Sequence, residues 1–171
     1  MKGVGAKPNS LKIIALLVLP LLVSCSPRDD HFGYGRSSFA TNGERIYFTG
    51  TSASGKAITA SGGTGMMSMH RQMHGGGCAI CHGEEREGRR LWPQFWIKAP
   101  ALTAQALFSD SHGHDGHDDH GNYNAETLRR VITDGLTPAG EALDYAMPRW
   151  KMSQSDLDDL VAYLQQPRAH D

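Results

Sequence analysis

The stretch Cys78-Ala79-Ile80-Cys81-His82 decides how the rest of this sequence is interpreted. Two thiols three positions apart on a helical turn project to the same side, so both can add to the two vinyl groups on one edge of a porphyrin. The adjacent imidazole then supplies a neutral nitrogen as an axial ligand of the iron. This spacing is typical of covalent haem attachment. We therefore expect one covalently bound haem c, held by Cys78, Cys81 and His82.

Two other kinds of site use the same residue types. A redox-active dithiol of the thioredoxin kind is disfavoured, because such sites follow a buried β-strand, whereas three glycines at 75–77 precede Cys78 here. A zinc site would require two further ligands at matched spacing, and His70 and His74 keep this alternative open.

The length and the charge of the chain exclude several classes of function. The 171 residues suffice for one domain and a targeting segment. The net charge is -1, from 17 basic and 18 acidic residues, so nothing indicates a surface for nucleic acid. No nucleophile with a base partner, no phosphate-binding loop and no paired carboxylates stand out, so we expect an electron-transfer protein and not an enzyme.

The N-terminal residues are typical of an export signal. Lysines precede an apolar run over 13–23 that is too short to span a bilayer comfortably. The run ends in Leu22-Val23-Ser24-Cys25, which resembles a bacterial lipobox. The resemblance implies a signal peptide over 1–24, a lipidated Cys25 and a flexible tether over 25–39. We expect a periplasm-facing bacterial lipoprotein anchored to the inner or outer membrane; an ordinary secretory signal with an incidental cysteine is the alternative.

Three segments carry signals for helices. Thr41 or Asn42 caps a first helix over 43–48 that Gly50 ends. The second helix spans 124–133 and ends at Gly135, and the third begins after Ser153 and ends before Pro167. The third carries one apolar stripe: Leu157, Leu160, Val161 and Leu164. Glycines at 62–63 disfavour a hairpin through 56–60, so no strand of useful length is expected.

Beyond the pentapeptide, the sequence resembles class I cytochromes c. Gly83-Glu84 continues the attachment motif, Ala99-Pro100-Ala101-Leu102 is similar to the segment that crosses beneath the proximal histidine, and Tyr145-Ala146-Met147-Pro148-Arg149-Trp150 is similar to the methionine loop. The resemblance implies an all-α class I cytochrome c fold, with three to five helices around one haem, over residues 40–167. It also implies a close crossing of the first and last helices, with Gly43 and Tyr47 against Tyr163.

The resemblance also implies roles for Pro100 and Met147. The carbonyl of Pro100 would accept the second ring N–H of His82, which fixes the tautomer; Pro93 competes for this role. Met147 would be the distal ligand, since a soft, neutral thioether favours ferrous iron and fills the sixth position. Met152 is expected to be core filler. The walls of the haem pocket are expected among Trp92, Phe95, Trp96, Leu102, Leu128, Ile132 and Trp150.

Two insertions depart from the family pattern. The first, over 51–77, is rich in glycine and methionine and is expected to be a loop. The second, over 109–122, contains His112, His114, His117 and His120 among aspartates and glycines. These histidines are either copper, zinc or nickel ligands or part of a solvated acidic loop, and a copper role for the methionines stays open as well.

The expected function is the transfer of single electrons. The partners would be a dehydrogenase or another respiratory protein on one side and an oxidase or another cytochrome on the other, with the membrane reached through the lipid anchor. Two alternatives remain: a haem enzyme or sensor with an open sixth position, and a metal-binding lipoprotein that uses the histidine loop.

Overall fold

The computed structural model describes residues 38–63, 76–109 and 123–167, together with the isolated positions 1, 3, 5, 65, 68 and 69. Most of the expected signal peptide, Cys25 and nearly all of the tether lie outside these residues. The same holds for His112, His114, His117 and His120. Lipidation and metal binding by the histidine loop are therefore expectations on which the structure does not bear.

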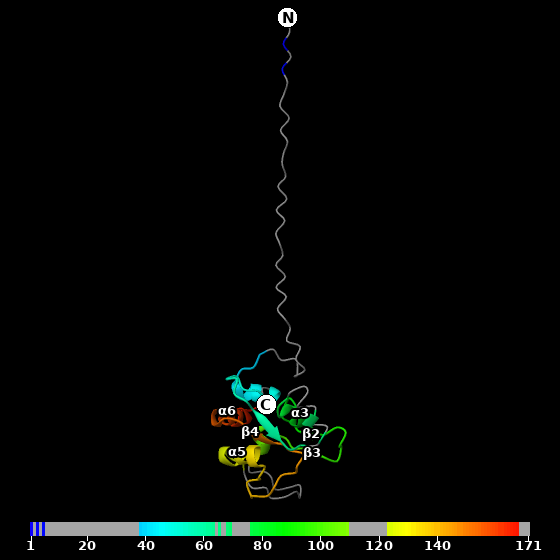
Figure 1. Cartoon of the computed structure of the whole chain (residues 1–171), viewed down its shortest axis with the longest axis vertical. Coiled ribbons are helices and arrows are strands. Elements are labelled where there is room, and N and C mark those ends of the chain that lie inside the picture. Colours follow the sequence, from blue (N-terminus) through cyan, green and yellow to red (C-terminus); the bar gives the residue numbers. More distant parts are fainter. Residues whose placement is uncertain are drawn as a thin grey trace.

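Helices α1 (Asn42–Thr49) and α6 (Gln154–Leu164) pack against each other and lie side by side in Figure 1. A Cβ atom at Gly43 would lie 2.0 Å from the carbonyl oxygen of Asp159, so only glycine allows the two backbones to approach this closely. The rings of Tyr47 and Tyr163 pack beside this contact with their centroids 5.4 Å apart. Both helices and their crossing confirm the sequence prediction.

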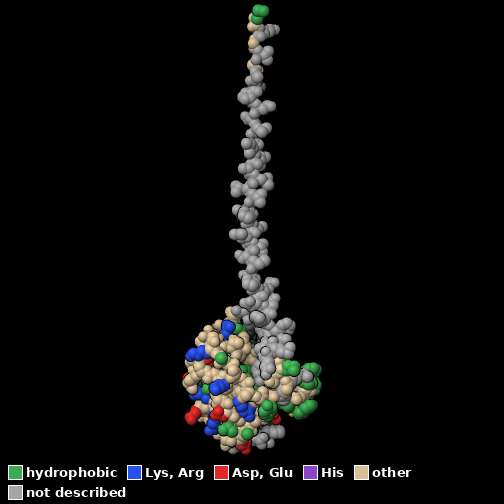
Figure 2. All heavy atoms as spheres, in the orientation of Figure 1, with side chains coloured by type: hydrophobic (Ala, Val, Ile, Leu, Met, Phe, Trp, Pro, Cys, Tyr) green, Lys and Arg blue, Asp and Glu red, His purple; other side chains and the backbone are tan. Residues whose placement is uncertain are grey.

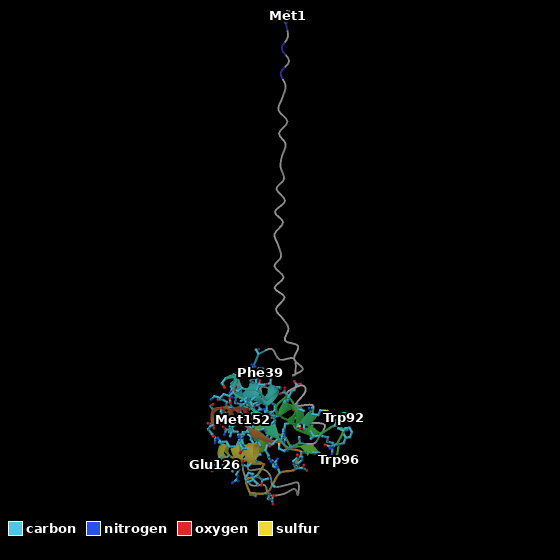
Figure 3. All side chains as sticks on the ribbon, in the orientation of Figure 1. Met1, Phe39, Trp92, Trp96, Glu126 and Met152 are labelled. Atoms are coloured by element: carbon cyan, nitrogen blue, oxygen red, sulfur yellow. The ribbon has the colours of Figure 1, made fainter. Side chains whose placement is uncertain are left out.

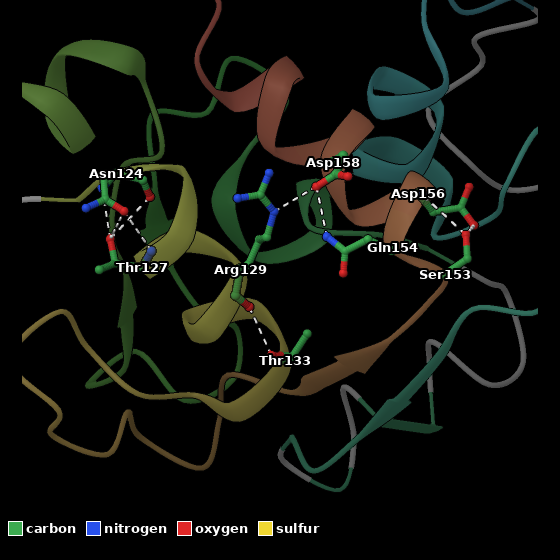
Figure 4. Close-up of polar contacts among 8 residues, drawn as sticks. All are labelled: Asn124, Thr127, Arg129, Thr133, Ser153, Gln154, Asp156 and Asp158. Carbon is green, nitrogen blue, oxygen red and sulfur yellow. Dashed lines mark hydrogen bonds and ion pairs between the residues drawn. The ribbon is translucent and has the colours of Figure 1, made fainter.

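Helix α5 (Ala125–Asp134) packs against α6 and also confirms its prediction. Asn124 and Thr127 form a reciprocal capping box at its start, and Gly135 ends it in the left-handed conformation. Arg129 Nε donates to Asp158 Oδ1 of α6 at 2.7 Å, which joins the two helices at their surface (Figure 4).

The two remaining described helices are short: α3 (Ala79–His82) and α4 (Ala104–Phe108). The core lies between these five helices. Its buried residues are Ile46, Tyr47, Phe48, Ala79, Leu107, Leu128, Ile132, Trp150, Leu157, Leu160, Val161 and Leu164. The apolar stripe predicted for the last helix therefore faces the core. None of the helices among the described residues reaches the length and hydrophobicity that a membrane crossing requires.

The expectation of an all-α class I cytochrome c fold is wrong, because the domain contains two antiparallel sheets of two strands each. Strand β1 (Thr59–Ser61) pairs with β4 (Arg149–Lys151), and β2 (Arg89–Arg90) pairs with β3 (Lys98–Ala99). Strands of two or three residues are too short to show the alternating pattern by which a strand is recognised in a sequence.

The first insertion is accordingly not the plain loop that its glycines indicated. Gly62 and Gly63 adopt positive φ angles of 83° and 90° directly after β1, and the Gly63 amide donates to the Tyr145 carbonyl at 3.0 Å. The glycines therefore end the strand and turn the chain toward the methionine loop, where the sequence analysis took them to exclude a strand.

Candidate functional site

The cysteine-containing segment is fixed against the end of α1. The amides of Gly76 and Gly77 donate to the carbonyls of Thr49 and Phe48 at 3.1 and 3.2 Å, which satisfies acceptors that the helix leaves open. A Cβ atom at Gly77 would lie 2.3 Å from the Ile46 carbonyl oxygen. The glycines before the cysteines therefore allow a close backbone contact that a side chain would prevent.

Cys78 and Cys81 stand one helical turn apart, and both side chains are half-buried. Cys78 packs against the apolar core. Burial and the neighbouring Cys81 raise the pKa of the Cys78 thiol to about 12, so this thiol stays protonated and weakly reactive in the folded chain. This environment disfavours a redox-active dithiol, since redox-active cysteines have a lowered pKa.

His82 is the most informative side chain of the site. It is 4% exposed, and its Nδ1 lies 2.8 Å from the Pro100 carbonyl oxygen. Because a carbonyl only accepts, Nδ1 carries the proton, and the lone pair of the neutral ring is on Nε2. Burial lowers the pKa of His82 against the opposing effect of the Pro100 carbonyl, so the ring is neutral near pH 7.

The Nε2 atom of His82 is buried and has no hydrogen-bond partner among the described residues. A buried acceptor that stays unsatisfied destabilises the fold by roughly 1–3 kcal/mol. Such an atom is suited to bind a metal ion, and a neutral imidazole whose other nitrogen is fixed by a carbonyl is the usual form of a metal-ligating histidine.

The sheet that was not expected is what brings Pro100 to His82. Strands β2 and β3 form a hairpin that ends at Pro100, and the Gly88 amide donates to the His82 carbonyl at 2.8 Å. A Cβ atom at Gly88 would lie 2.5 Å from the Ala99 carbonyl oxygen and 2.6 Å from Pro100 C. The hairpin therefore places the carbonyl of Pro100 against the histidine, while the competing Pro93 lies in the loop between the two strands.

Two buried side chains hold this segment: Tyr47, which was expected only at the helix crossing, and Arg86, which was not expected at all. The Tyr47 hydroxyl donates to the Gly83 carbonyl at 2.6 Å, and burial raises the pKa of Tyr47 far above its ordinary value. Arg86, with an unusual positive φ of 60°, donates from Nη1 to the carbonyls of Tyr163 and Gln166 at 3.0 and 2.9 Å. Its own carbonyl accepts from the Leu102 amide at 2.8 Å.

Nothing in the sequence marked Arg86, because it stands in a run of charged residues that is typical of a solvated loop. Its burial and its left-handed backbone become visible only in the fold. Strain of this kind persists where surrounding contacts outweigh it. Arg86 thus joins the end of α6 to the segment that follows His82.

Met147 lies in the turn before β4, half-buried and packed against the same apolar core that Cys78 contacts. Its amide donates to the Asp144 carbonyl at 3.1 Å, and Arg149 donates to the Met147 carbonyl and, at 2.9 Å, to that of Leu143. The turn therefore has a defined shape. Met152, the expected core filler, is also half-buried against the core.

The expected pocket walls divide into two groups. Leu128, Ile132 and Trp150 are buried, and Leu102 packs against them from a half-buried position. Trp92, Phe95 and Trp96 are 67%, 55% and 77% exposed, so they do not pack with the other four, and their role as walls stays a prediction. All three lie between β2 and β3, and Figure 3 labels Trp92 and Trp96 at the edge of the domain.

The residues present fit a covalently attached haem. Two half-buried cysteines flank one helical turn, the neutral histidine after them offers a buried lone pair, and a backbone carbonyl fixes its tautomer. No three His, Cys, Asp or Glu side chains within the described ranges converge on a single metal ion. The zinc alternative needs His70 and His74, which lie outside those ranges.

Comparison of the chain with protein-family models, with curated proteins and with solved structures gives no match.

Proposed function

We propose that this chain is a monohaem c-type cytochrome that transfers single electrons between redox proteins in the periplasm. The observation that carries the proposal is the His82 ring: Nδ1 is bonded to the Pro100 carbonyl, and Nε2 is buried without a partner among the described residues. Cys78 and Cys81 would hold the porphyrin through thioether bonds, and His82 would be the proximal ligand. A haem bound in this way supplies a reversible one-electron couple at the iron.

The residues around the proposed haem would restrict its iron to electron transfer. The carbonyl of Pro100 holds the proton on Nδ1 and so leaves the lone pair on Nε2, which would bind the iron. Met147 is the proposed distal ligand, and its turn is held by Arg149. His82 and Met147 would hold the iron together, and this pair of ligands would favour electron exchange over the binding of small molecules.

The first test is the mass and the optical spectrum of the full chain, made in a cell with haem-ligation machinery. We expect the mass of one added haem and the spectrum of a c-type cytochrome. The Cys78→Ala/Cys81→Ala variant should lose the covalent attachment, and His82→Ala should lose the low-spin spectrum. A colourless chain without added mass would contradict the proposal.

The second test separates an electron carrier from a haem enzyme or sensor. We expect the oxidised protein to be low-spin, with a methionine-to-iron charge-transfer band that Met147→Ala abolishes. Met152→Ala is the matched control, since Met152 is also half-buried against the core, and it should keep the band. A high-spin native form would assign an open sixth position and would contradict electron transfer as the function.

We further propose that Cys25 carries the lipid that anchors the protein at a bacterial membrane, facing the periplasm. The support is the lipobox-like sequence before Cys25. Mass analysis of the purified chain should show acyl chains on an N-terminal Cys25, and Cys25→Ala should prevent that lipidation and the cleavage before it. A mature chain that starts elsewhere and carries no lipid would contradict the anchor.

A further inference from the structure

The loop between β2 and β3, residues 91–97, projects three aromatic side chains from the domain. Trp92, Phe95 and Trp96 are 67%, 55% and 77% exposed, although residues of this size are normally buried. Figure 2 shows hydrophobic side chains gathered at one edge of the molecule, and Figure 3 labels Trp92 and Trp96 at that edge. Large aromatics collected on one loop indicate a surface that contacts something else.

The loop presents these side chains in a defined shape. The Leu91 amide donates to the Ile97 carbonyl at 2.9 Å, and the Ile97 amide donates to the Gln94 carbonyl at 2.8 Å. Arg90 Nη1 donates to the Phe95 carbonyl at 2.9 Å, and Leu91 is buried beneath the loop. The aromatic exposure is therefore built into the hairpin and does not result from a loosely attached segment.

The charged residues that flank the loop directly are of one sign, whereas the exposed Glu84, Glu85 and Glu87 precede β2. Arg89 and Arg90 on β2 and Lys98 on β3 are exposed on either side of the aromatic residues. The chain as a whole is nearly neutral, yet residues 88–109 contain no Asp or Glu. Aromatic side chains with cations beside them match the boundary between headgroups and acyl chains of an anionic bilayer.

The size of the patch favours a lipid surface over a stably bound protein partner. The exposed fractions amount to about two aromatic side chains, or roughly 400 Å². A stable protein interface needs about 800 Å² on each partner. A membrane imposes no such requirement, because a few aromatic side chains with cations beside them suffice for an interfacial contact.

We propose that residues 91–97 dock in the interfacial region of an anionic membrane, with Trp92, Phe95 and Trp96 in the headgroup layer. The proposed lipid at Cys25 supplies proximity, since the 13 residues from there to Ser38 span at most about 45 Å. Each cation near an anionic surface favours docking roughly fivefold, so three cations give on the order of a hundredfold preference over a neutral bilayer.

The test uses the full chain, reconstituted into vesicles of phosphatidylcholine alone or of phosphatidylcholine with phosphatidylglycerol. Hydroxyl-radical oxidation of single residues is followed by mass spectrometry. We expect Trp92 and Trp96 to be protected on the anionic vesicles only, and protection to disappear at high salt. Tyr145, which is 70% exposed on another loop, should react equally in both preparations.

A second measurement follows hydrogen exchange of residues 91–97. The Trp92→Ser/Trp96→Ser variant should lose the slowing of exchange on anionic vesicles, and Tyr145→Ser, the matched control, should keep it. Equal oxidation of both tryptophans on the two kinds of vesicle would overturn the proposal. Protection that arises only on addition of a redox protein would also overturn it and would assign the loop to that partner.

The inference relies on the proposed lipid anchor for proximity alone, and the mass of the same preparation shows whether the lipid is present. A lipidated chain without loop protection overturns the docking proposal and leaves the anchor intact. A chain without lipid that is still protected supports docking and contradicts the anchor. Haem content is measured on the same preparation, and neither the docking result nor the anchor result depends on it.

Discussion

Replacing Gly88 with alanine tests whether the close passage of the hairpin positions Pro100. A Cβ atom there would lie 2.5 Å from the Ala99 carbonyl oxygen, 2.6 Å from Pro100 C and 2.7 Å from the Ala101 nitrogen. All three are backbone atoms, so no side-chain rotation relieves the clash. Overpacking of this kind costs about 1–3 kcal/mol.

Gly55 provides the matched control. Its φ is 74°, against 73° for Gly88, and a Cβ atom there would have no neighbour within 4 Å. A left-handed backbone destabilises an L-residue by about 1–2 kcal/mol. Alanine offsets about 0.4–1 kcal/mol of this, because it reduces the conformational freedom of the unfolded chain. These two contributions are the same for both variants. The difference between the unfolding free energies of the two variants therefore measures the clash alone.

We expect Gly88→Ala to unfold in guanidinium with a free energy lower than that of Gly55→Ala by about 1–3 kcal/mol. The His82 ring N–H should also exchange faster with solvent in Gly88→Ala alone, because the clash moves Pro100 away from Nδ1. Equal free energies of unfolding for the two variants, with equal exchange at His82, would refute the reasoning.

Three further changes test buried polar contacts. Burial raises the pKa of Asp156, but hydrogen bonds to this carboxylate outweigh burial and hold the pKa below its ordinary value of 3.8. The ionised carboxylate therefore stabilises the fold fully at neutral pH, and this contribution is lost as the pH falls below about 4. Asp156→Asn should flatten this acid limb of a plot of unfolding free energy against pH, and an unchanged limb would contradict the assignment. Tyr47→Phe removes the shorter of the two hydrogen bonds that the Gly83 carbonyl accepts, leaving that of the Arg86 amide at 3.3 Å, and should lower the unfolding free energy by about 0.5–1.5 kcal/mol in urea, with no effect counting against the bond. Arg86→Gln removes donors from the carbonyls at the end of α6 and should speed amide exchange in that last turn, whereas unaltered exchange would show that Arg86 does not hold it.

The three longest of the described helices could be predicted from the sequence because their signals are local. Thr41, Asn124 and Ser153 cap their helices through side-chain acceptors within three residues, and Gly50 and Gly135 end two of them in the left-handed conformation. Each of these signals lies within one turn of the residues that it orders. A single sequence is sufficient for interactions of that range.

The sheets could not be predicted, because their information is not local. Thr59 pairs with Lys151 across most of the domain, and neither strand has the length to show a period. The same limit applies at the site. The sequence offered both Pro93 and Pro100 as the partner of His82, and only the hairpin places one of them, Pro100, at 2.8 Å. Arg86 was missed because a buried arginine and an exposed one look alike in a sequence.

The contacts of Arg86 with the end of α6 bear on the order in which the chain matures. A polypeptide that emerges from a membrane channel with its N-terminus first presents Cys78 and Cys81 long before residues 163–166 arrive. Until they do, the guanidinium has no carbonyls to bind, and the crossing of α1 with α6 cannot form. If the chain is exported and modified as proposed, the two thiols would remain open to a modifying enzyme until the final turn of α6 forms.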